Sequence, residues 1–406
     1  MRILALAWEF PPRIIGGISR HVAELYPEVI KRGHEVHLIT VAIANEPLEV
    51  IVDGIHVHRV HVEPSHDFFH WVAQMNANML HFAKDFLSSH VLSNRSGDSE
   101  THFSVDLIHA HDWLVEMVAL TLTRELNIPL VTTIHATEYG RCNGIHNDTQ
   151  QYIHQKEIQL TQASQRVIVC SEYMRGELQR ALGCPADKTD VVYNGLSNER
   201  WRNIAADGED DMVALKKKYA EPEEAVIYFV GRITFEKGIY VLLNAMPKIV
   251  AAMEDKVRLV IIGTGNAYSI LLQRQAWDLG IFHKVLFTGF MADEDFWQFQ
   301  KIASCAIFPS LYEPFGIVAL ESFAAKVPLV VSDTGGLPEV VRHQVTGIVT
   351  RVNDANSLAD GIISILRDPD YAQTLVAEAQ YDLKERFSWD LLAAQTEDIF
   401  MKALKT

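Results

Sequence analysis

Short apolar runs alternate with helix-like stretches along the first half of the chain. Residues 3–8 are apolar, a glycine pair follows, and residues 19–31 have a helical pattern that ends before Gly33. Residues 35–41 form a second apolar run, which completes a β-α-β unit of about 40 residues. Further apolar runs, each followed by a helix-like segment, lie at residues 105–110, 129–135 and 166–170. Continuous apolar strands between helices predict a parallel sheet with both faces covered.

The same rhythm restarts in the second half, after a charged and strand-poor stretch at residues 198–224. Five more strands are predicted there, at residues 225–230, 258–262, 284–288, 305–309 and 328–332. We therefore predict an α/β protein of two Rossmann-like domains, residues 1–200 and 201–386, and a final helix at about residues 387–406. Ligands of open parallel sheets bind beyond the carboxyl ends of the strands, so two sheets that face each other predict a site in the cleft between them.

Composition and charge narrow the class of protein. Hydrophobic types make up 48% of the 406 residues, which is ample for a large core and excludes a disordered chain. The formal charge is −16, from 36 basic and 52 acidic residues. A protein that binds the backbone of nucleic acid usually carries the opposite sign, so we expect no nucleic-acid partner. An anionic ligand would need a local basic site within this acidic protein.

Cysteine usage and hydropathy bear on the compartment. The four cysteines are far apart, in no CxxC or Cys/His finger spacing, so a structural zinc is not expected. Scattered thiols are typical of a reducing cytosol, and we expect a cytoplasmic protein. No apolar run approaches 18 residues, so no membrane span is expected.

Two loops that follow predicted strands carry groups suited to an anion. Gly16 and Gly17 precede the first helix, whose N-terminal amides favour negative charge, although a tight turn capped by Ser19 explains them equally well. Arg232 and Lys237 stand five positions apart in the loop after residues 225–230. Both cations can converge on a diphosphate beyond the sheet edge, the alternative being surface charge paired with a neighbouring glutamate.

A third loop is the most informative. It follows residues 305–309 and contains Glu313, with a helix expected from about Ile317 that carries Glu321 on its second turn. Carboxylates accept hydrogen bonds from sugar hydroxyls, and the first amides of this helix suit phosphate oxygens. The alternative is compensation of the helix dipole, for which Glu321 lies late in the helix. Gly335 and Gly336 form a second glycine pair at a strand end, which fits close approach to a ligand or a plain loop.

Histidines and paired acids offer further candidates. His135 ends a predicted strand and is suited to hold a substrate oxygen, although a structural role is an alternative for any such histidine. Asp112 follows another strand end. The acidic triplets at residues 293–295 and 368–370 resemble metal-binding DxD sequences. The first stands just ahead of a helix expected at residues 296–302, where acids cap the N-terminus, and the second contains a proline in an expected polar linker. We therefore predict no metal site from these triplets.

Taken in order along the chain, these residues resemble the retaining glycosyltransferases of GT-B fold in glycosyltransferase family 4, near the glycogen and starch synthase type. The motifs that carry the resemblance are Glu9-Phe10-Pro11-Pro12 with Gly16-Gly17, His109-Ala110-His111-Asp112-Trp113, Val230-Gly231-Arg232 with Lys237-Gly238, Glu313 with Glu321, and Phe387-Ser388-Trp389. The resemblance covers nearly the whole chain. It implies that the final helix crosses back to the first domain, which would face the acceptor while the second domain binds the donor.

The resemblance also implies roles for residues of the second domain. Arg232 and Lys237 would neutralise the diphosphate of the donor as the sugar departs. Glu313 would contact the transferred sugar, and Glu321 would hold the ribose hydroxyls. The sugar hydroxyls or the distal phosphate would be bound by the backbone amides of Phe315, Gly316 and Ile317.

In the first domain, the resemblance implies that Gly16 and Gly17 approach the diphosphate. His135 would bind the 6-hydroxyl of the sugar and support the developing positive charge through its backbone carbonyl. Asp112 would lie beside the acceptor. Ile14 and Ile15 stand where the synthase-type loop usually has a lysine. This departure counts against polymer synthesis more than against glycosyl transfer.

The expected activity is transfer of a hexose, glucose above all, from a nucleoside-diphosphate sugar to a glucan or another sugar acceptor, without a metal or other cofactor. The alternatives are a mannosyltransferase or another family 4 enzyme with a small acceptor, a GT-B-like sugar-nucleotide epimerase, and a sugar-nucleotide sensor without turnover. The nucleotide base, the acceptor and the oligomeric state stay open at this point.

Overall fold

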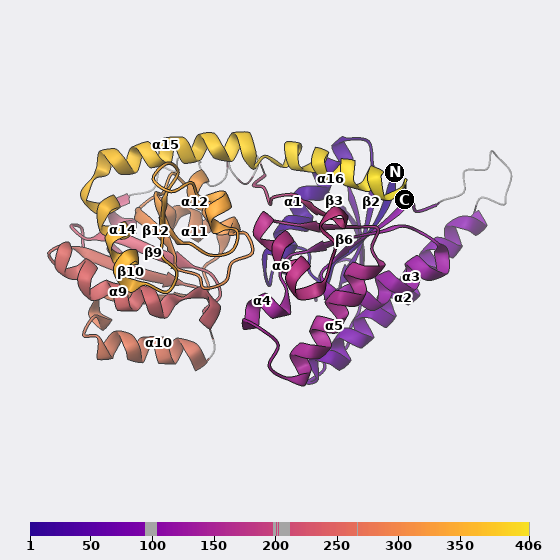
Figure 1. Ribbon diagram of the computed structural model, residues 1–406, viewed down its shortest axis with the longest axis horizontal. Coiled ribbons are helices and arrows are strands. Elements are labelled where there is room, and N and C mark those ends of the chain that lie inside the picture. The colour runs from indigo at the N-terminus through magenta and orange to yellow at the C-terminus, as the bar shows by residue number, and fades with distance from the viewer. Residues whose placement is uncertain (94–103, 198–199, 201, 203–211, 266, 406) are drawn as a thin grey trace. The chain divides into compact units, whose positions relative to one another are not determined.

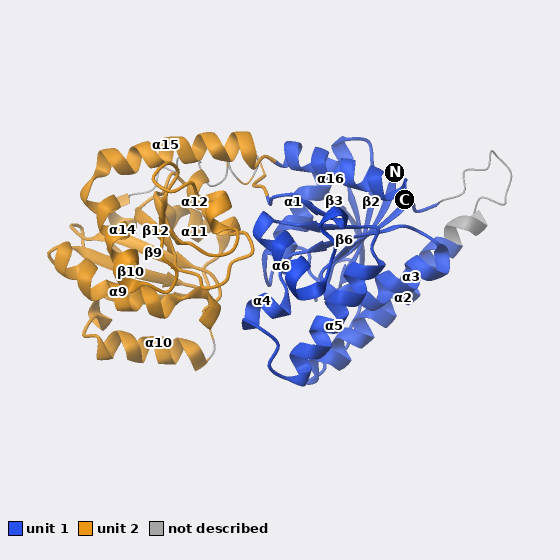
Figure 2. Ribbon diagram, in the orientation of Figure 1, with its two compact units in different colours: residues 1–194, 389–406 blue, residues 195–388 orange. Residues whose placement is uncertain are grey.

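The computed structural model describes residues 1–405 apart from 94–103, 198–199, 201, 203–211 and 266 (Figure 1). The chain divides into two compact units: residues 1–194 with 389–406, and residues 195–388 (Figure 2). Each unit is an α/β structure built on its own sheet, which confirms the predicted fold class. None of the helices formed by the described residues is long and apolar enough to cross a membrane.

Unit 1 contains an eight-stranded sheet in the order β3-β4-β2-β1-β5-β6-β7-β8. All neighbouring strands are parallel except β3 and β4, which form an antiparallel pair at one edge. The strands are β1 (Arg2–Leu6), β2 (Glu35–Val41), β3 (Glu49–Val52), β4 (Ile55–Val60), β5 (Leu107–His111), β6 (Leu130–Ile134), β7 (Arg166–Val169) and β8 (Thr189–Val191). Its helices of eight or more residues are α1 (Gly17–Lys31), α2 (Phe68–Ser93), α3 (Glu116–Leu126), α5 (Asp148–Ala163), α6 (Glu172–Leu182) and α16 (Trp389–Ala403).

The last helix of the chain, α16, belongs to unit 1 and packs on α1. Leu392 and Phe400 share one apolar cluster with Val22 and Leu25 of α1. The indole N–H of Trp389 donates to the Glu24 carboxylate at 2.8 Å. Burial of these apolar side chains is the main stabilising contribution of such a helix.

Unit 2 contains a six-stranded, fully parallel sheet in the order β11-β10-β9-β12-β13-β14. The strands are β9 (Ala225–Val230), β10 (Val257–Ile262), β11 (Val285–Gly289), β12 (Ala303–Phe308), β13 (Leu329–Ser332) and β14 (Ile348–Thr350). Its helices of eight or more residues are α9 (Ile239–Ala252), α10 (Ala267–Asp278), α11 (Asp293–Gln300), α12 (Ile317–Ala324), α14 (Ala355–Arg367) and α15 (Pro369–Arg386). The buried strands and the helices on both faces are those expected of a parallel sheet.

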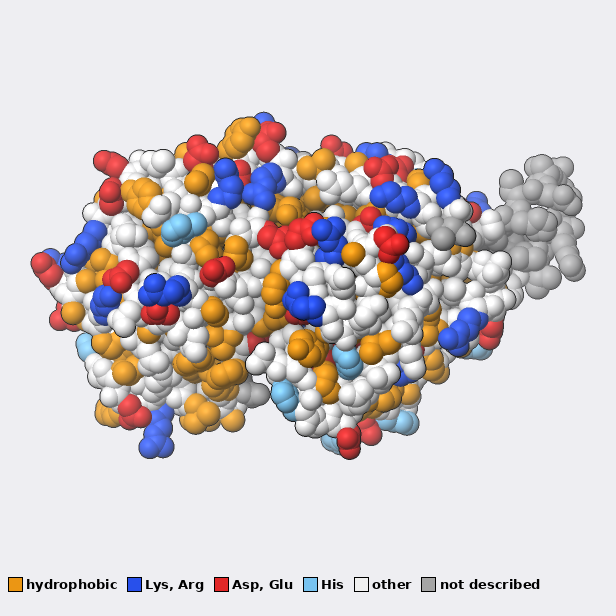
Figure 3. Space-filling model, viewed as in Figure 1, with side chains coloured by type: hydrophobic (Ala, Val, Ile, Leu, Met, Phe, Trp, Pro, Cys, Tyr) orange, Lys and Arg blue, Asp and Glu red, His pale blue; other side chains and the backbone are white. Residues whose placement is uncertain are grey.

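Acidic and basic side chains are interspersed with apolar ones over both units on the face drawn in Figure 3. The net charge of −16 is therefore not gathered into one acidic field on this face. An anion that binds on this face therefore interacts mainly with the charged side chains next to it, because exposed charges are screened beyond about 10 Å.

Candidate functional site

The loops after β9 and β12 meet through an ion pair at the carboxyl edge of the unit 2 sheet. Lys237 ends the short 3-10 helix η3 (Phe235–Lys237), and its Nζ lies 2.7 Å from Oε2 of Glu313 in the loop after β12. Only 19% of the lysine side chain is exposed. The backbone N–H of Leu311 also donates to the carbonyl oxygen of Glu236 at 2.7 Å, which ties the two loops together. Sequence analysis selected Lys237 and Glu313 separately, and the structure places them in direct contact.

Arg232 lies in the same loop after β9, but its side chain is more exposed than that of Lys237. Its side chain is 56% exposed, and its Nη2 is 3.9 Å from Oε1 of Glu236. The weak contact with Glu236 is the surface pairing that sequence analysis left open. Because the guanidinium stays exposed, it keeps its hydrogen-bond donors available to an anion at this edge of the sheet.

Glu321 is a buried carboxylate on the second turn of α12, as the sequence predicted. Its Oε1 is 2.5 Å from Nη2 of Arg200, and both side chains are at most 10% exposed. A buried carboxylate needs such a partner, because an isolated charge is costly to bury. Sequence analysis missed Arg200, since it lies 121 residues away and no local pattern marks it.

Glycines set the shape of the same edge. Gly316 precedes α12 with a φ of +101°, in the left-handed region that glycine adopts readily. Gly335 has a φ of +59°, and a Cβ atom there would lie 1.8 Å from the carbonyl oxygen of Glu313. The N–H of Gly336 donates to that same oxygen at 2.9 Å. Gly335 and Gly336 therefore allow the backbone of Glu313 to approach them closely. The close approach at this glycine pair is made by the chain itself.

In unit 1, an internal carboxylate lies against the start of α1. Glu9 is 1% exposed, and its Oε2 accepts the N–H groups of Ile15 at 2.7 Å and Gly16 at 3.0 Å. Burial raises the pKa of Glu9, while these amide bonds oppose the increase. Gly17 begins the helix itself, and Ser19 lies inside the first turn, so the alternative of a turn capped by Ser19 is wrong. The glycine pair thus frames a loop whose first amides already hold Glu9.

A chain of hydrogen bonds leads to His135, just after β6. Thr133 Oγ1 lies 2.8 Å from Nε2 of His109, whose Nδ1 is 2.9 Å from the hydroxyl of Tyr26. That hydroxyl is 2.8 Å from Nε2 of His111, whose Nδ1 is 3.1 Å from Nε2 of His135. The ring atom of His135 that faces this network is therefore Nε2.

Burial keeps these imidazoles neutral. It lowers the pKa of His135 to about 3, helped by the positive charge of Arg141, and it lowers the pKa of His109 and His111 as well. His21 packs edge-on against His135 with ring centroids 4.7 Å apart, and burial lowers its pKa to about 3. A neutral imidazole both donates and accepts one hydrogen bond, so His135 is suited to hold a hydroxyl and not to act as an acid at neutral pH.

Asp112 fixes the backbone of His135. It is 3% exposed, it has a φ of +60° and a ψ of 172°, and its Oδ1 accepts the N–H of His135 at 2.7 Å. Only glycine usually adopts such backbone angles, so this conformation is strained for an aspartate. Burial raises the pKa of Asp112 to about 6, although Arg141 and the amides of His135 and Ala136 oppose the increase. The family resemblance implies a place beside the acceptor, and the structure shows that Oδ1 of this carboxylate accepts a backbone N–H within the chain.

A second buried acid, Glu157 of α5, lies in the same part of unit 1. Its Oε1 accepts the N–H of Glu138 at 2.8 Å, next to the loop that carries His135. Burial raises the pKa of Glu157 to about 8, and the charge of Asp112 adds to the increase. Glu157 is therefore protonated at neutral pH. Sequence analysis did not select it, since nothing in a helical stretch of polar residues marks one acid as buried.

The two acidic triplets lie at helix N-termini. Residues 293–295 form the first turn of α11, and Asp368 accepts the N–H of Tyr371 at 2.9 Å at the start of α15. Acids stabilise these positions by satisfying amides and opposing the helix dipole. The helix terminus expected for the first triplet is confirmed, whereas the linker expected for the second is wrong, because Asp368 caps α15 and Pro369 begins it.

Comparison with known proteins decides the family. A model described as Glycosyltransferase Family 4 matches residues 15–200, and one described as Glycosyl transferases group 1 matches residues 212–382. An uncharacterized glycosyltransferase of Methanocaldococcus jannaschii is 35% identical over 405 residues, which is 100% of this chain and 99% of that protein. This chain belongs to glycosyltransferase family 4. A glycogen synthase of Mycobacterium tuberculosis is 30% identical to this glycosyltransferase, over 99% of this chain and 95% of that protein.

Solved structures show the same fold. Sucrose-phosphate synthase from Thermosynechococcus elongatus matches with a TM-score of 0.80 and 22% identity, over 99% of this chain and 98% of that one. Anabaena HepE in complex with UDP and glucose matches with a TM-score of 0.76 and 21% identity, over 99% of both chains. These likenesses confirm the GT-B fold of this family 4 glycosyltransferase.

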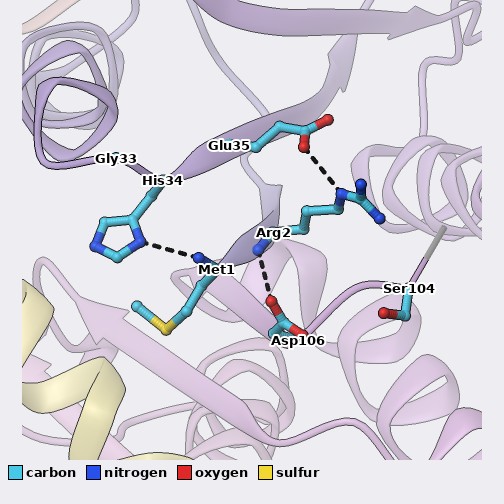
Figure 4. Close-up of a pocket in the computed structure, with 7 residues that line it drawn as sticks. All are labelled: Met1, Arg2, Gly33, His34, Glu35, Ser104 and Asp106. Atoms are coloured by element: carbon cyan, nitrogen blue, oxygen red, sulfur yellow. Dashed lines mark hydrogen bonds and ion pairs between the residues drawn. The ribbon is translucent and has the colours of Figure 1, made fainter. Parts of the chain in front are cut away.

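A cavity of about 370 Å³ lies elsewhere in unit 1 of the glycosyltransferase (Figure 4). Its walls include Arg2 and Glu35, the first residues of β1 and β2, and Asp106 just before β5. The guanidinium of Arg2 donates to Glu35, and the backbone N–H of Arg2 donates to Asp106 at 2.8 Å. The cavity is therefore at the amino end of these strands, whereas His135 and Asp112 follow the carboxyl ends of β6 and β5.

Proposed function

We propose that this enzyme transfers a hexose, most simply glucose, from a nucleoside-diphosphate sugar to a carbohydrate acceptor, with retention of configuration at the anomeric carbon. The observation that carries the proposal is the Lys237–Glu313 contact of 2.7 Å at the carboxyl edge of the unit 2 sheet, with the exposed guanidinium of Arg232 in the same loop. This is the edge at which ligands of open parallel sheets bind.

The charges suit a departing diphosphate. As the anomeric bond breaks, negative charge grows on the leaving phosphate, and fixed positive groups nearby lower the barrier. Lys237 is held in place by Glu313 and by the tied loops, so it needs little reorganisation to meet that charge. Arg232 adds a planar group that can bind two phosphate oxygens.

The neutral imidazole of His135 and the carboxylate of Asp112 in unit 1 suit the sugar. His135 presents Nδ1 to a hydroxyl, while its backbone is held by Asp112 at 2.7 Å. The backbone carbonyl of His135 is then available to the positive charge that develops at the anomeric carbon. Asp112 already accepts amide hydrogen bonds, which makes it a poor nucleophile.

We propose retention without a double displacement. A double displacement needs a free carboxylate on the face opposite the leaving group. Among the candidate acids described above, Glu313 is paired with Lys237, Glu321 with Arg200, and Asp112 with backbone amides. We therefore propose front-face transfer, in which the leaving phosphate takes the proton of the acceptor hydroxyl as the new bond forms.

The choice of glucose and of a glucan-like acceptor draws on the relatives. The Mycobacterium tuberculosis relative is named a glycogen synthase, and HepE has been solved with UDP and glucose. Lys237 and Arg232 supply the positive charge that a divalent cation would otherwise bring to a diphosphate, so we propose that turnover needs no metal. The expected cellular location is the cytoplasm.

A panel of donors tests the proposal. ADP-, UDP- and GDP-glucose, with GDP-mannose, are first ranked by the rise in melting temperature that each causes, because a ligand stabilises the folded state by mass action. The preferred donor is then incubated with glucans and simple sugars, and the products are analysed by mass and by the NMR coupling of the anomeric proton. The proposal predicts an α-linked product from an α-linked donor, with unchanged turnover in chelator.

Other outcomes would contradict specific parts of the proposed function. A β-linked product would contradict retention. A changed sugar nucleotide without transfer would identify an epimerase, and binding without any turnover would identify a sensor. Loss of activity in chelator that Mg²⁺ or Mn²⁺ restores would contradict metal independence.

A further inference from the structure

Three side chains at the amino end of the unit 1 sheet form a group that the proposed reaction does not use. Glu35 and His37 lie two residues apart on β2 and so project from the same face of the sheet. His56 on the parallel neighbour β4 is directly opposite His37 in the register. One carboxylate oxygen and one ring nitrogen from each histidine all lie within 4.8 Å of one another.

The groups around these three side chains hold them in place. Arg2 Nε donates to Oε2 of Glu35 at 2.9 Å, so Oε1 is the oxygen that faces His37, at 2.9 Å from its Nε2. The other nitrogen of His37, Nδ1, is 3.1 Å from Nε2 of His58. Metal-binding histidines usually have such a partner on the second nitrogen, which fixes the ring and leaves the first nitrogen for the ion.

The third side chain, His56, is held in place by ring stacking. The ring of His56 stacks on that of His37, with centroids 4.7 Å apart and planes 18° apart. Among the residues that the structure describes, no side chain makes a hydrogen bond with His56. The Glu35 side chain is 39% exposed and His56 is half-buried, so an ion has access from solvent.

We propose that Glu35, His37 and His56 bind a divalent transition-metal ion, Zn²⁺ in particular, through Oε1 of Glu35 and one nitrogen of each histidine. Two imidazoles and a carboxylate are ligands that zinc accepts, with solvent at the fourth position, whereas Mg²⁺ and Ca²⁺ prefer oxygen alone. The ion replaces the proton that His37 and Glu35 share at 2.9 Å.

The site lies at the amino ends of β2 and β4, whereas His135 follows the carboxyl end of β6. Its effect is therefore on stability: the ion ties β2 to β4 and stabilises the folded state by mass action. Phe86 lies 5.0 Å from the ring of His37 and shields that side of the site from water, which strengthens the charge interactions of the ion.

Competition with a chromophoric zinc chelator tests the proposal on the full-length, metal-free protein. The expected result is one equivalent of Zn²⁺ bound, a higher melting temperature with zinc, and a Co²⁺ form with the visible absorption of a four- or five-coordinate site. His56→Ala should lose binding by more than the roughly 10- to 100-fold that loss of a hydrogen-bond partner of a ligand usually costs. His61→Ala removes an exposed histidine just beyond β4 and serves as the matched control, with unchanged binding.

Two further variants keep the result decisive. Glu35→Gln removes the charged ligand at a partly exposed position, so it tests the site even if His56→Ala does not fold. His135→Ala tests the other three-histidine group, formed with His21 and His111. Equal zinc affinity in wild type, His56→Ala and Glu35→Gln would overturn the proposal, and so would binding that only His135→Ala abolishes.

Discussion

Replacing Glu157 by glutamine should make this glycosyltransferase more stable at neutral pH. The carboxyl is 2% exposed and accepts the N–H of Glu138 at 2.8 Å through Oε1. Its Oε2 lies 3.9 Å from Nδ1 of His154, and neither atom has a hydrogen-bond partner among the described residues. Glutamine keeps an oxygen for Glu138 and presents an NH₂ group to His154, without a titrating group.

The size of the effect follows from the pKa of Glu157, which burial raises from 4.5 to about 8. At pH 7 the carboxyl is ionised in the unfolded chain and protonated in the folded one, so folding must take up a proton. The interval from 4.5 to 7 is about 2.5 pH units, and at about 1.36 kcal/mol per unit the cost is on the order of 3 kcal/mol. Glutamine avoids this cost.

The pH dependence has a definite sign. A carboxyl whose pKa is raised by folding contributes no penalty below the unfolded pKa, and the penalty grows as the pH rises from 4.5 to about 8. The stability advantage of Glu157→Gln should therefore be small at pH 4.5, increase through neutrality and level off above pH 8. At pH 7 it corresponds to a rise in melting temperature of roughly 6–12 °C for a unit of about 200 residues.

Thermal and urea unfolding of both proteins between pH 4.5 and 9 measure this advantage. Glu116→Gln is the matched control, since Glu116 is also buried in unit 1 but lies 3.1 Å from Nζ of Lys156. Its replacement removes the charged partner of that lysine and should lower stability. Glu157→Gln that is less stable than wild type at pH 7, or an advantage that does not grow with pH, would refute the reasoning.

Three other substitutions have expected outcomes. In urea unfolding, Gly335→Ala should lower stability by far more than Gly183→Ala. Both glycines have a positive φ, which costs an alanine about 1–2 kcal/mol, but of the two only Gly335 would place the new Cβ within 2 Å of backbone. Tyr26→Phe removes the hydroxyl between two buried histidines and should lower kcat while leaving nucleotide affinity unchanged; unaltered turnover would contradict the network. In wild type, turnover should fall below about pH 6, because protonation of Asp112 weakens its hydrogen bond to the N–H of His135, and Asp112→Asn should show no such fall in its pH profile.

Much of the fold could be predicted from hydrophobic pattern alone. The run at residues 35–41 became β2 with the same bounds, and the run at residues 225–230 became β9. Most residues of these two strands are buried, so apolar types predominate in both. The pattern did not locate β8 and β14, which have three residues each, or the edge strand β3, whose exposed and half-buried residues alternate. Short strands and edge strands bury too little to leave a continuous apolar run.

The candidate site divides in the same way. Strand-end position and charge selected Lys237 and Glu313, and these residues meet, because the carboxyl ends of neighbouring parallel strands lie at one edge. The partners of other site residues could not be found, since they come from distant segments. Arg200 reaches Glu321 from 121 residues away, and Tyr26 reaches the histidine network from 83 residues away. Only the folded chain brings such groups together.

Calorimetric titration of nucleoside diphosphates into wild type and Lys237→Ala tests the central claim most directly. ADP, UDP and GDP are compared, and Lys248→Ala is the control, since Lys248 is a half-exposed lysine of the same unit paired with Asp360 at 2.6 Å. If Lys237 binds the diphosphate, the preferred nucleotide should lose roughly 10- to 100-fold in affinity, as expected for a charged hydrogen bond of about 1.5–3 kcal/mol. Lys248→Ala should bind like wild type. Equal affinity in wild type and Lys237→Ala would contradict the account.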